Sequence, residues 1–129
     1  MKLITIFLSL LLITTNAYAE WTLYSLDSKG NVRFYDKSSV KRNGDKVRVW
    51  MYLNVPPDDK ESKSVNMASL RSLEEIDCVN ETTKTLSFQT FTKQNLEGDS
   101  RDMTNPNPTI DYIVPESVSV TLMKLVCKK

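Results

Sequence analysis

The chain has 129 residues, with 17 Lys and Arg, 16 Asp and Glu, and no His. This near balance of charge excludes the basic surface on which nucleic-acid binding usually depends, so no nucleic-acid partner is expected. The absence of His excludes His-based triads, His general bases and every metal site built on imidazole, and no metal or cofactor is predicted. A chain of this length forms one domain.

The N-terminal segment has the pattern of a cleavable secretory signal peptide. Lys2 precedes an almost unbroken apolar run over residues 3–13, and Ala17-Tyr18-Ala19 has the small residues that a signal peptidase accepts. The run is about eleven residues long, whereas a membrane-spanning helix needs roughly 20, so an uncleaved anchor is the weaker alternative. We predict cleavage between Ala19 and Glu20, with a signal peptide over residues 1–19 and a domain over residues 20–129.

The cysteines agree with an exported protein. No Cys follows the predicted cleavage site to take a lipid, and residues 20–129 contain no second long apolar run. The domain is therefore expected to be periplasmic or secreted, with no membrane span after processing. Cys78 and Cys127 are an even pair, which predicts a disulfide in an exported chain. Closing a loop of about 50 residues would stabilise the fold by roughly 4 kcal/mol.

Alternating apolar and polar residues predict several strands. The pattern covers residues 21–26, 32–36 and, most clearly, 46–54, which follows the hairpin dipeptide Asn43-Gly44. Along 46–54 the side chains divide into two sets, with Val47, Val49, Met51 and Leu53 on one face and Arg48, Trp50, Tyr52 and Asn54 on the other.

The rest of the domain alternates between predicted loops and less certain elements. Residues 55–63 and 95–109 are predicted to be loops, and residues 83–93 a strand. Residues 64–78 fit either a strand or a helix. The last segment alternates like a strand over residues 117–122. Yet Val118, Leu122 and Leu125 also lie at helical spacing, and Ser117 is placed to cap a helix.

Short sequence pieces occur in a fixed order along the domain. The most specific is residues 69–78, SLRSLEEIDC, of the form S-x-[KR]-x-L-x-E-x-D-C, and downstream of it lie Val114-Pro-Glu-Ser117 and Leu125-Val-Cys127. Upstream lie Phe34-Tyr35-Asp36 and Val47-Arg-Val-Trp50. In this order the pieces resemble the surface-adhesin protein E family of Gram-negative bacteria, over nearly all of the domain.

The resemblance implies an α+β fold. This is a single antiparallel β-sheet with one C-terminal α-helix packed on one face, tied to the sheet by the disulfide. It makes residues 64–78 a strand and the last segment a helix. It also implies an exported, non-enzymatic interaction protein with an adhesin-like fold, which binds host or envelope proteins. The alternative is a small periplasmic enzyme or an enzyme inhibitor, and an enzyme would need a polar cleft with paired groups of shifted pKa.

A strand over residues 64–78 would divide its side chains between two faces. Cys78 must face the helix that holds Cys127, so Leu70 and Ile76 belong to the core, and Glu74 is a misfit there. The opposite face carries Ser69, Arg71, Leu73, Glu75 and Asp77. No catalytic residue is predicted, because the adjacent carboxylates Asp58-Asp59 and Glu74-Glu75 point to opposite faces and cannot converge.

The candidate binding face combines the outward residues of the two central strands. They are Arg48, Trp50, Tyr52, Arg71, Glu75 and Asp77. Arg, Trp and Tyr on one sheet surface are the composition of binding hot spots. A protein partner is one expectation for this face, and a homodimer is another. A third is an ordinary solvated face, with Arg48 or Arg71 paired across strands to Glu75.

Overall fold

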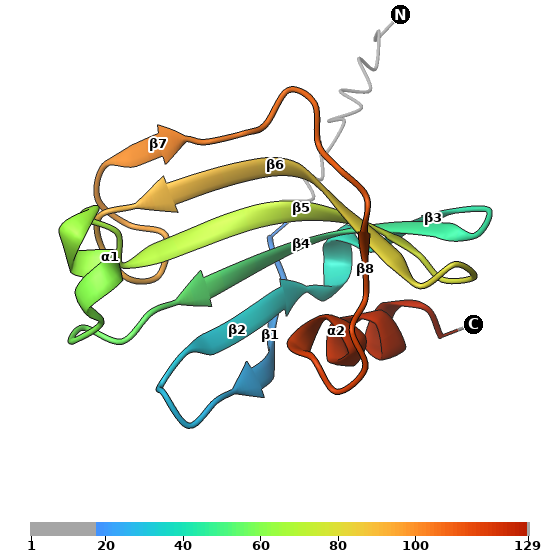
Figure 1. Cartoon of the computed structure of the whole chain (residues 1–129), viewed down its shortest axis with the longest axis horizontal. Coiled ribbons are helices and arrows are strands. Elements are labelled where there is room, and N and C mark those ends of the chain that lie inside the picture. The colour runs from blue at the N-terminus through green and yellow to red at the C-terminus, as the bar shows by residue number, and fades with distance from the viewer. Residues whose placement is uncertain (1–17, 129) are drawn as a thin grey trace, which may run out of the picture.

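One antiparallel sheet makes up most of the structure, a computed structural model that describes residues 18–128 (Figure 1). Neighbouring strands run in the order β1-β2-β4-β5-β6-β7, with β3 paired to β4 and β8 paired to β6. The strands are β1 Trp21–Leu26, β2 Val32–Asp36, β3 Lys41–Asn43, β4 Lys46–Asn54, β5 Ser69–Asp77, β6 Thr82–Phe91, β7 Ser100–Asp102 and β8 Asp111–Tyr112. The predicted signal peptide lies outside the described residues except for Tyr18 and Ala19, so its cleavage stays a prediction.

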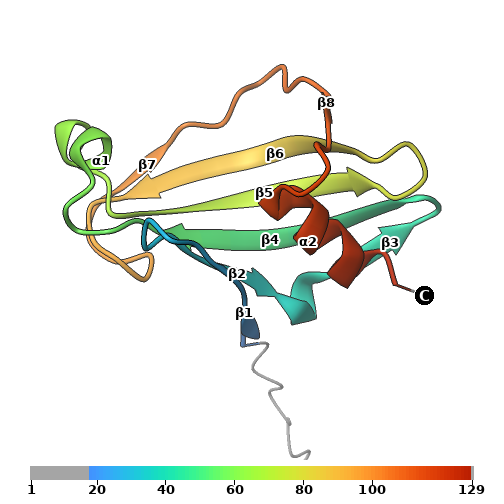
Figure 2. The same ribbon diagram turned by 60° about the horizontal axis from the view of Figure 1, so that its bottom comes forward.

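The helix α2, Val118–Val126, crosses one face of the sheet (Figure 2). The buried side chains of α2 pack into a core with strand residues, and this core consists of Tyr35, Val47, Val49, Ile76, Ile113, Leu122, Met123 and Val126. A disulfide joins Cys78, which follows β5, to Cys127, which follows α2. The predicted fold class and disulfide are confirmed.

The alternation along β4 decides which side chains meet the helix. Val47 and Val49 are both 0 % exposed in the core, and Met51 packs against the same cluster. Their pairing partners on β5 include Ile76, opposite Val47. Successive side chains of a strand point to opposite faces, so Trp50 and Tyr52 lie on the side away from α2.

A short helix interrupts the first predicted loop. α1, Lys60–Ser64, begins after Asp59, whose Oδ2 accepts a hydrogen bond from the backbone N of Ser62 at 3.0 Å. This is the ordinary action of an Asp N-cap, which satisfies one of the free amides of a first helical turn. The expectation of an uninterrupted exposed loop over residues 55–63 is therefore wrong.

Three very short strands were absent from the sequence pattern. β7 lies inside the second predicted loop and pairs with the end of β6, from Gln89 to Phe91. β8 follows that loop, and β3 pairs with the start of β4. Two or three polar residues are too few to show alternation, and the neighbouring strand's free backbone groups hold them in place. The expectation of structureless backbone over residues 95–109 is wrong.

The start of α2 also differs in one detail. Ser117 occupies the N-cap position with extended backbone, but its side chain makes no capping hydrogen bond. Its Oγ instead donates to the carbonyl oxygen of Val114 at 2.6 Å. The expected helix is confirmed, whereas the expected cap is wrong, because the hydroxyl closes the preceding turn.

Candidate functional site

The face of the sheet turned away from α2 is called here the outer face. On β4 and β5 it carries the candidate residues in register, with Arg48 opposite Glu75, Trp50 opposite Leu73 and Tyr52 opposite Arg71. Residues that face each other on an antiparallel pair lie close enough to interact. The six candidates therefore form one continuous strip, which ends at Asp77 opposite Lys46.

Tyr52 is at the centre of an aromatic cluster. Its ring stacks on Phe34 of β2, with centroids 4.6 Å apart, and meets the edge of Trp21 of β1 at 4.7 Å. Tyr52 is consequently only 8 % exposed, and this burial raises the pKa of its phenol. The expectation that Tyr52 stands open on the outer face is wrong, because rings from β1 and β2 cover it.

Arg71 lies between two aromatic rings of the outer face. Its guanidinium carbon is 5.6 Å from the ring centroid of Trp50 and 5.5 Å from that of Phe91. Its Nε donates a hydrogen bond to Oε1 of Gln89. None of the ion pairs between described residues includes Arg71. Cation–π contacts hold the Arg71 guanidinium against these two rings, and no carboxylate within residues 18–128 forms an ion pair with it.

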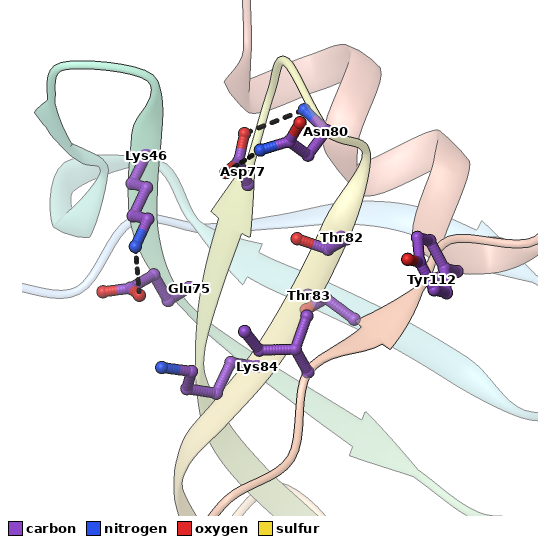
Figure 3. A pocket seen from close by; sticks show the side chains of 9 residues that line it. Lys46, Glu75, Asp77, Asn80, Thr82, Thr83, Lys84 and Tyr112 are labelled. Atoms are coloured by element: carbon purple, nitrogen blue, oxygen red, sulfur yellow. Dashed lines mark hydrogen bonds and ion pairs between the residues drawn. The ribbon is translucent and has the colours of Figure 1, made fainter.

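At the other end of the strip the charges are paired. The Nε of Arg48 lies 2.9 Å from Oε2 of Glu75, and the Nζ of Lys46 lies 3.9 Å from Oε1 of the same carboxylate. The cross-strand pair that was expected for an ordinary solvated face, with Arg48 or Arg71 on Glu75, is present with Arg48. Beside it is a hollow of about 420 Å³, into which Lys46, Glu75 and Lys84 reach from three strands, with Tyr112 at its β8 side (Figure 3).

Asp77 has a different task from its neighbours. Its Oδ1 accepts from the backbone N of Val79 and of Asn80, and its Oδ2 accepts from Nδ2 of Asn80 (Figure 3). The hydrogen bonds from Asn80 lower the pKa of the Asp77 carboxyl. Asp77 therefore closes the turn between β5 and β6, and its position opposite Lys46 keeps it at the end of the strip, beside the hollow.

Three aromatic members of the outer face were absent from the sequence-based site. Trp21, Phe34 and Phe91 come from β1, β2 and β6. Their alternation within each strand was visible in the sequence. Their meeting with Tyr52 and Arg71 depends on the register between strands, for example Phe34 opposite Tyr52, which no local pattern contains.

Glu74, the misfit of the helix-side face, is held by hydroxyl groups. Its carboxylate accepts hydrogen bonds from Oγ of Ser72 at 2.7 Å, from Oγ1 of Thr85 at 3.0 Å and from Oγ1 of Thr83 at 3.2 Å. It lines a cavity of about 190 Å³ between the sheet and α2. Tyr24 lines the same cavity, and burial raises the pKa of its phenol to about 12.

Two further features bear on the kind of protein. Within residues 18–128 no group of three or more acidic or Cys side chains is placed to hold a metal ion. The helices of this part of the chain are all too short or too polar to cross a membrane.

The family comparison gives a match over residues 21–128, to the model described as surface-adhesin protein E. The chain belongs to the surface-adhesin protein E family. The resemblance inferred from the ordered sequence pieces is thus confirmed, and the chain is an exported, adhesin-like interaction protein by family. No curated protein gives a match to this sequence.

Solved structures of protein E from Haemophilus influenzae share the fold. Crystal form II of that protein has a TM-score of 0.63 and 11% sequence identity, covering 88% of this chain and 91% of the other. Protein E from non-typeable Haemophilus influenzae has a TM-score of 0.60 and 11% identity, covering 88% and 78%. At such identity the agreement concerns the backbone, so side chains of the outer face must be judged on this chain alone.

Proposed function

We propose that this chain binds a protein partner through the aromatic and Arg residues of its outer face. The observation that carries the proposal is Arg71, a cation seated between Trp50 and Phe91 with no ionic partner in the described chain. Trp and Arg at the centre of a packed surface are the residues that most often dominate binding energy. An acidic or carbonyl-rich segment of a partner would supply the hydrogen-bond acceptors that the Arg71 guanidinium can still bind.

The charged end of the face supports the same role. Arg48 and Glu75 form an ion pair in which the Arg48 side chain is 58% exposed and the Glu75 side chain 12% exposed, which places the Arg48 charge at a polar rim. The half-buried Trp50 and Leu73 lie next to it, opposite each other on β4 and β5. An apolar centre with a charged rim fits protein recognition better than it fits binding of a small molecule.

The behaviour of the acidic groups supports a role without catalysis. Four carboxyl groups have lowered pKa values, those of Asp27, Asp59, Asp77 and Asp102. In each case the largest cause is a hydrogen bond from a residue two to four positions later in the chain. Such shifts belong to turns and a helix cap, whereas a general acid needs a raised pKa in a cleft. A periplasmic enzyme or inhibitor is the less favoured alternative.

The place of action is outside the cytoplasm. The predicted cleavage after Ala19 and the disulfide both fit a periplasmic or secreted protein, because disulfides persist in oxidising compartments. The partner is accordingly a protein of the envelope or of a host.

Site-specific crosslinking tests this proposal. A photo-reactive amino acid in place of Leu73, in the strip, is expected to give one discrete protein adduct in intact cells or with host matrix proteins. The same residue in place of Leu125, which is 37 % exposed on α2, is the matched control and should give none. Arg71→Ala should abolish the Leu73 adduct while the far-ultraviolet circular dichroism stays unchanged.

The adduct mass separates a partner from a second copy of the chain. An adduct at twice the chain mass, lost on Arg71→Ala, would replace the partner by a homodimer on the same face. Equal labelling from both positions, or labelling that Arg71→Ala leaves intact, would contradict any role for the outer face.

A further inference from the structure

Just before β1, a backbone nitrogen donates a hydrogen bond to a buried carboxylate. The N of Glu20 donates a hydrogen bond to Oδ1 of Asp36 at 2.8 Å. Asp36 is 8 % exposed, and the same Oδ1 also accepts from the N of Ser38 at 3.0 Å and from Oγ of Ser38 at 2.6 Å. These three donors are neutral while Ala19 precedes Glu20. None of the ion pairs between described residues includes Asp36.

A buried carboxylate of this kind lacks a counter-ion. Burying a charge is costly unless an opposite charge accompanies it, and neutral donors offset only part of that cost. The structure therefore has a position for one cation, at the nitrogen of Glu20.

We infer that processing of the chain occurs at the Ala19–Glu20 bond and that the new α-ammonium group of Glu20 is the counter-ion of Asp36. Hydrolysis adds one water to this peptide bond, so that the water oxygen joins the carbonyl carbon of Ala19, which ends in a carboxylate, and both protons of the water end on the nitrogen of Glu20. The hydrogen bond to Asp36 then becomes a charge-assisted one without any movement of the chain.

Of the neighbouring peptide bonds, only cleavage at Ala19–Glu20 puts the new ammonium group next to Asp36. Cleavage one residue earlier would leave the ammonium group on Ala19, roughly 3.3 Å further along an extended chain. Cleavage one residue later would remove the donor nitrogen altogether. The sequence pattern Ala17-Tyr18-Ala19 points to the same bond independently.

The ion pair also bears on the outer face. Among the strands of residues 18–128, β1 lies at the edge of the sheet and pairs with β2, and its first residue, Trp21, packs its ring against Tyr52. The carbonyl of Glu20 accepts from the N of Lys37 at 3.0 Å, beside the Asp36 contact. Fixing Glu20 on Asp36 therefore also fixes Trp21, so processing strengthens the anchor of a ring that already belongs to the aromatic cluster. This inference stands whether or not the face binds a partner.

The test compares chains that differ only at the N-terminus. The chain is exported with its own leader, and its intact mass is expected to begin at Glu20. A second chain carries one Ser inserted between Ala19 and Glu20, which moves the ammonium group one residue away. A third is the processed chain after Nα-acetylation, which keeps the N–H donor and removes the charge. Denaturant unfolding is measured with the disulfide intact, in the Asp36 chain and in Asp36→Asn.

The processed Asp36 chain is expected to have a folding equilibrium constant about tenfold larger than the Ser-inserted and acetylated forms, since a charged hydrogen bond contributes more than a neutral one. In Asp36→Asn the three forms should agree within about twofold. Equal stability of the three forms with Asp36 present would overturn the ion pair, even if Asp36→Asn does not fold. An equal loss in both backgrounds would do the same. A mass that begins before or after Glu20 would overturn the processing site.

Discussion

The two faces of the sheet bury their apolar side chains in different ways. On the helix side, aliphatic side chains such as Val47, Val49 and Ile76 are covered by a separate element, α2. On the outer face, the rings of Trp21, Phe34 and Tyr52 cover one another. One strand, β4, contributes to both faces through successive residues.

This difference shows what alternation along a strand can and cannot reveal. Alternation assigns a residue to a face, as it does for Val49 and Trp50. It does not tell whether that face is open to water, because large rings from neighbouring strands can close it. The helix side should therefore depend on long-range covalent and aliphatic contacts, and the outer face on contacts between rings.

The largest expected effect is on the helix side. Cys127→Ser removes the disulfide that holds α2 to β5, and should lower the free energy of unfolding by about 4 kcal/mol, since it opens a loop with a sequence separation of 49. Denaturant unfolding under oxidising conditions measures it. Cys78→Ser should have the same effect, and two clearly unequal losses would show that the two Cys stabilise the fold separately.

A somewhat smaller loss is expected at the centre of the outer face. Tyr52→Ala removes a ring that is 8 % exposed and packed on two others, so the free energy of unfolding should fall by about 3 kcal/mol. Val65→Ala, at a position 65 % exposed, is the control and should change it by less than about 0.5 kcal/mol. If Tyr52→Ala also costs less than about 1 kcal/mol, the rings do not seal this face.

The half-buried neighbours Trp50 and Met51 compare the two faces directly. Trp50→Ala loses a ring in contact with Arg71, and Met51→Ala loses a side chain packed against the core. Each should cost roughly 2 kcal/mol, less than a fully buried residue of its type. Only Trp50→Ala should also weaken crosslinking from position 73. Parallel denaturant melts and crosslinking separate the two effects, and a loss of crosslinking in both variants would place the binding contacts elsewhere.

The ion pair at the rim should matter little to stability. Arg48→Ala removes the 2.9 Å contact to Glu75, whose side chain is 12% exposed, but the Arg48 side chain is 58% exposed and Lys46 still lies 3.9 Å from the same carboxylate. The expected loss is about 0.5 kcal/mol, and it should shrink further in high salt. A loss above about 2 kcal/mol that persists at high salt would mean that the pair is shielded from water.

The smallest effect at neutral pH is expected at Tyr24. Its pKa is raised by burial from 10.0 to about 12, so the folded state holds the proton more tightly than the unfolded chain. The stability that Tyr24 contributes is thus fully present below pH 10 and is lost as the pH rises from 10 to about 12. Tyr24→Phe should flatten this alkaline loss, as measured by unfolding at a series of pH values. A profile identical to that of the unchanged chain would place Tyr24 in water.

Much of the fold could be predicted from the sequence, because apolar and polar residues alternate along the long strands. β1, β2 and β4 alternate over five to nine residues, so their bounds could be predicted, and for β4 its two faces as well. β5 and α2 required the family resemblance, because their apolar spacing fits two structures equally well. Backbone pairing to a longer strand holds β3, β7 and β8 in place. A sequence of two or three residues does not indicate such pairing.

The candidate site was predictable only in part, for a related reason. The ion pair of Arg48 with Glu75 follows from facing positions on two long neighbouring strands. The burial of Tyr52 follows instead from the register of β1 and β2 against β4, which the turn geometry sets. Asp77 lies on the face that alternation assigned to it, and the turn that its carboxylate closes was not predicted.

The order of pairing in the sheet has a consequence for how the chain folds. β4, β5 and β6 each pair with the next strand along the chain, and the turn from β5 to β6 covers only residues 78–81, so these hairpins can close within about 10 microseconds. Docking of α2 joins segments far apart in sequence, and such steps are slow because much chain entropy must be lost first. The hairpins should therefore form while the core residues Val47, Val49 and Ile76 are still uncovered. Since the chain has only two Cys, oxidation allows a single intramolecular pairing, and the late closure of α2 needs no disulfide reshuffling.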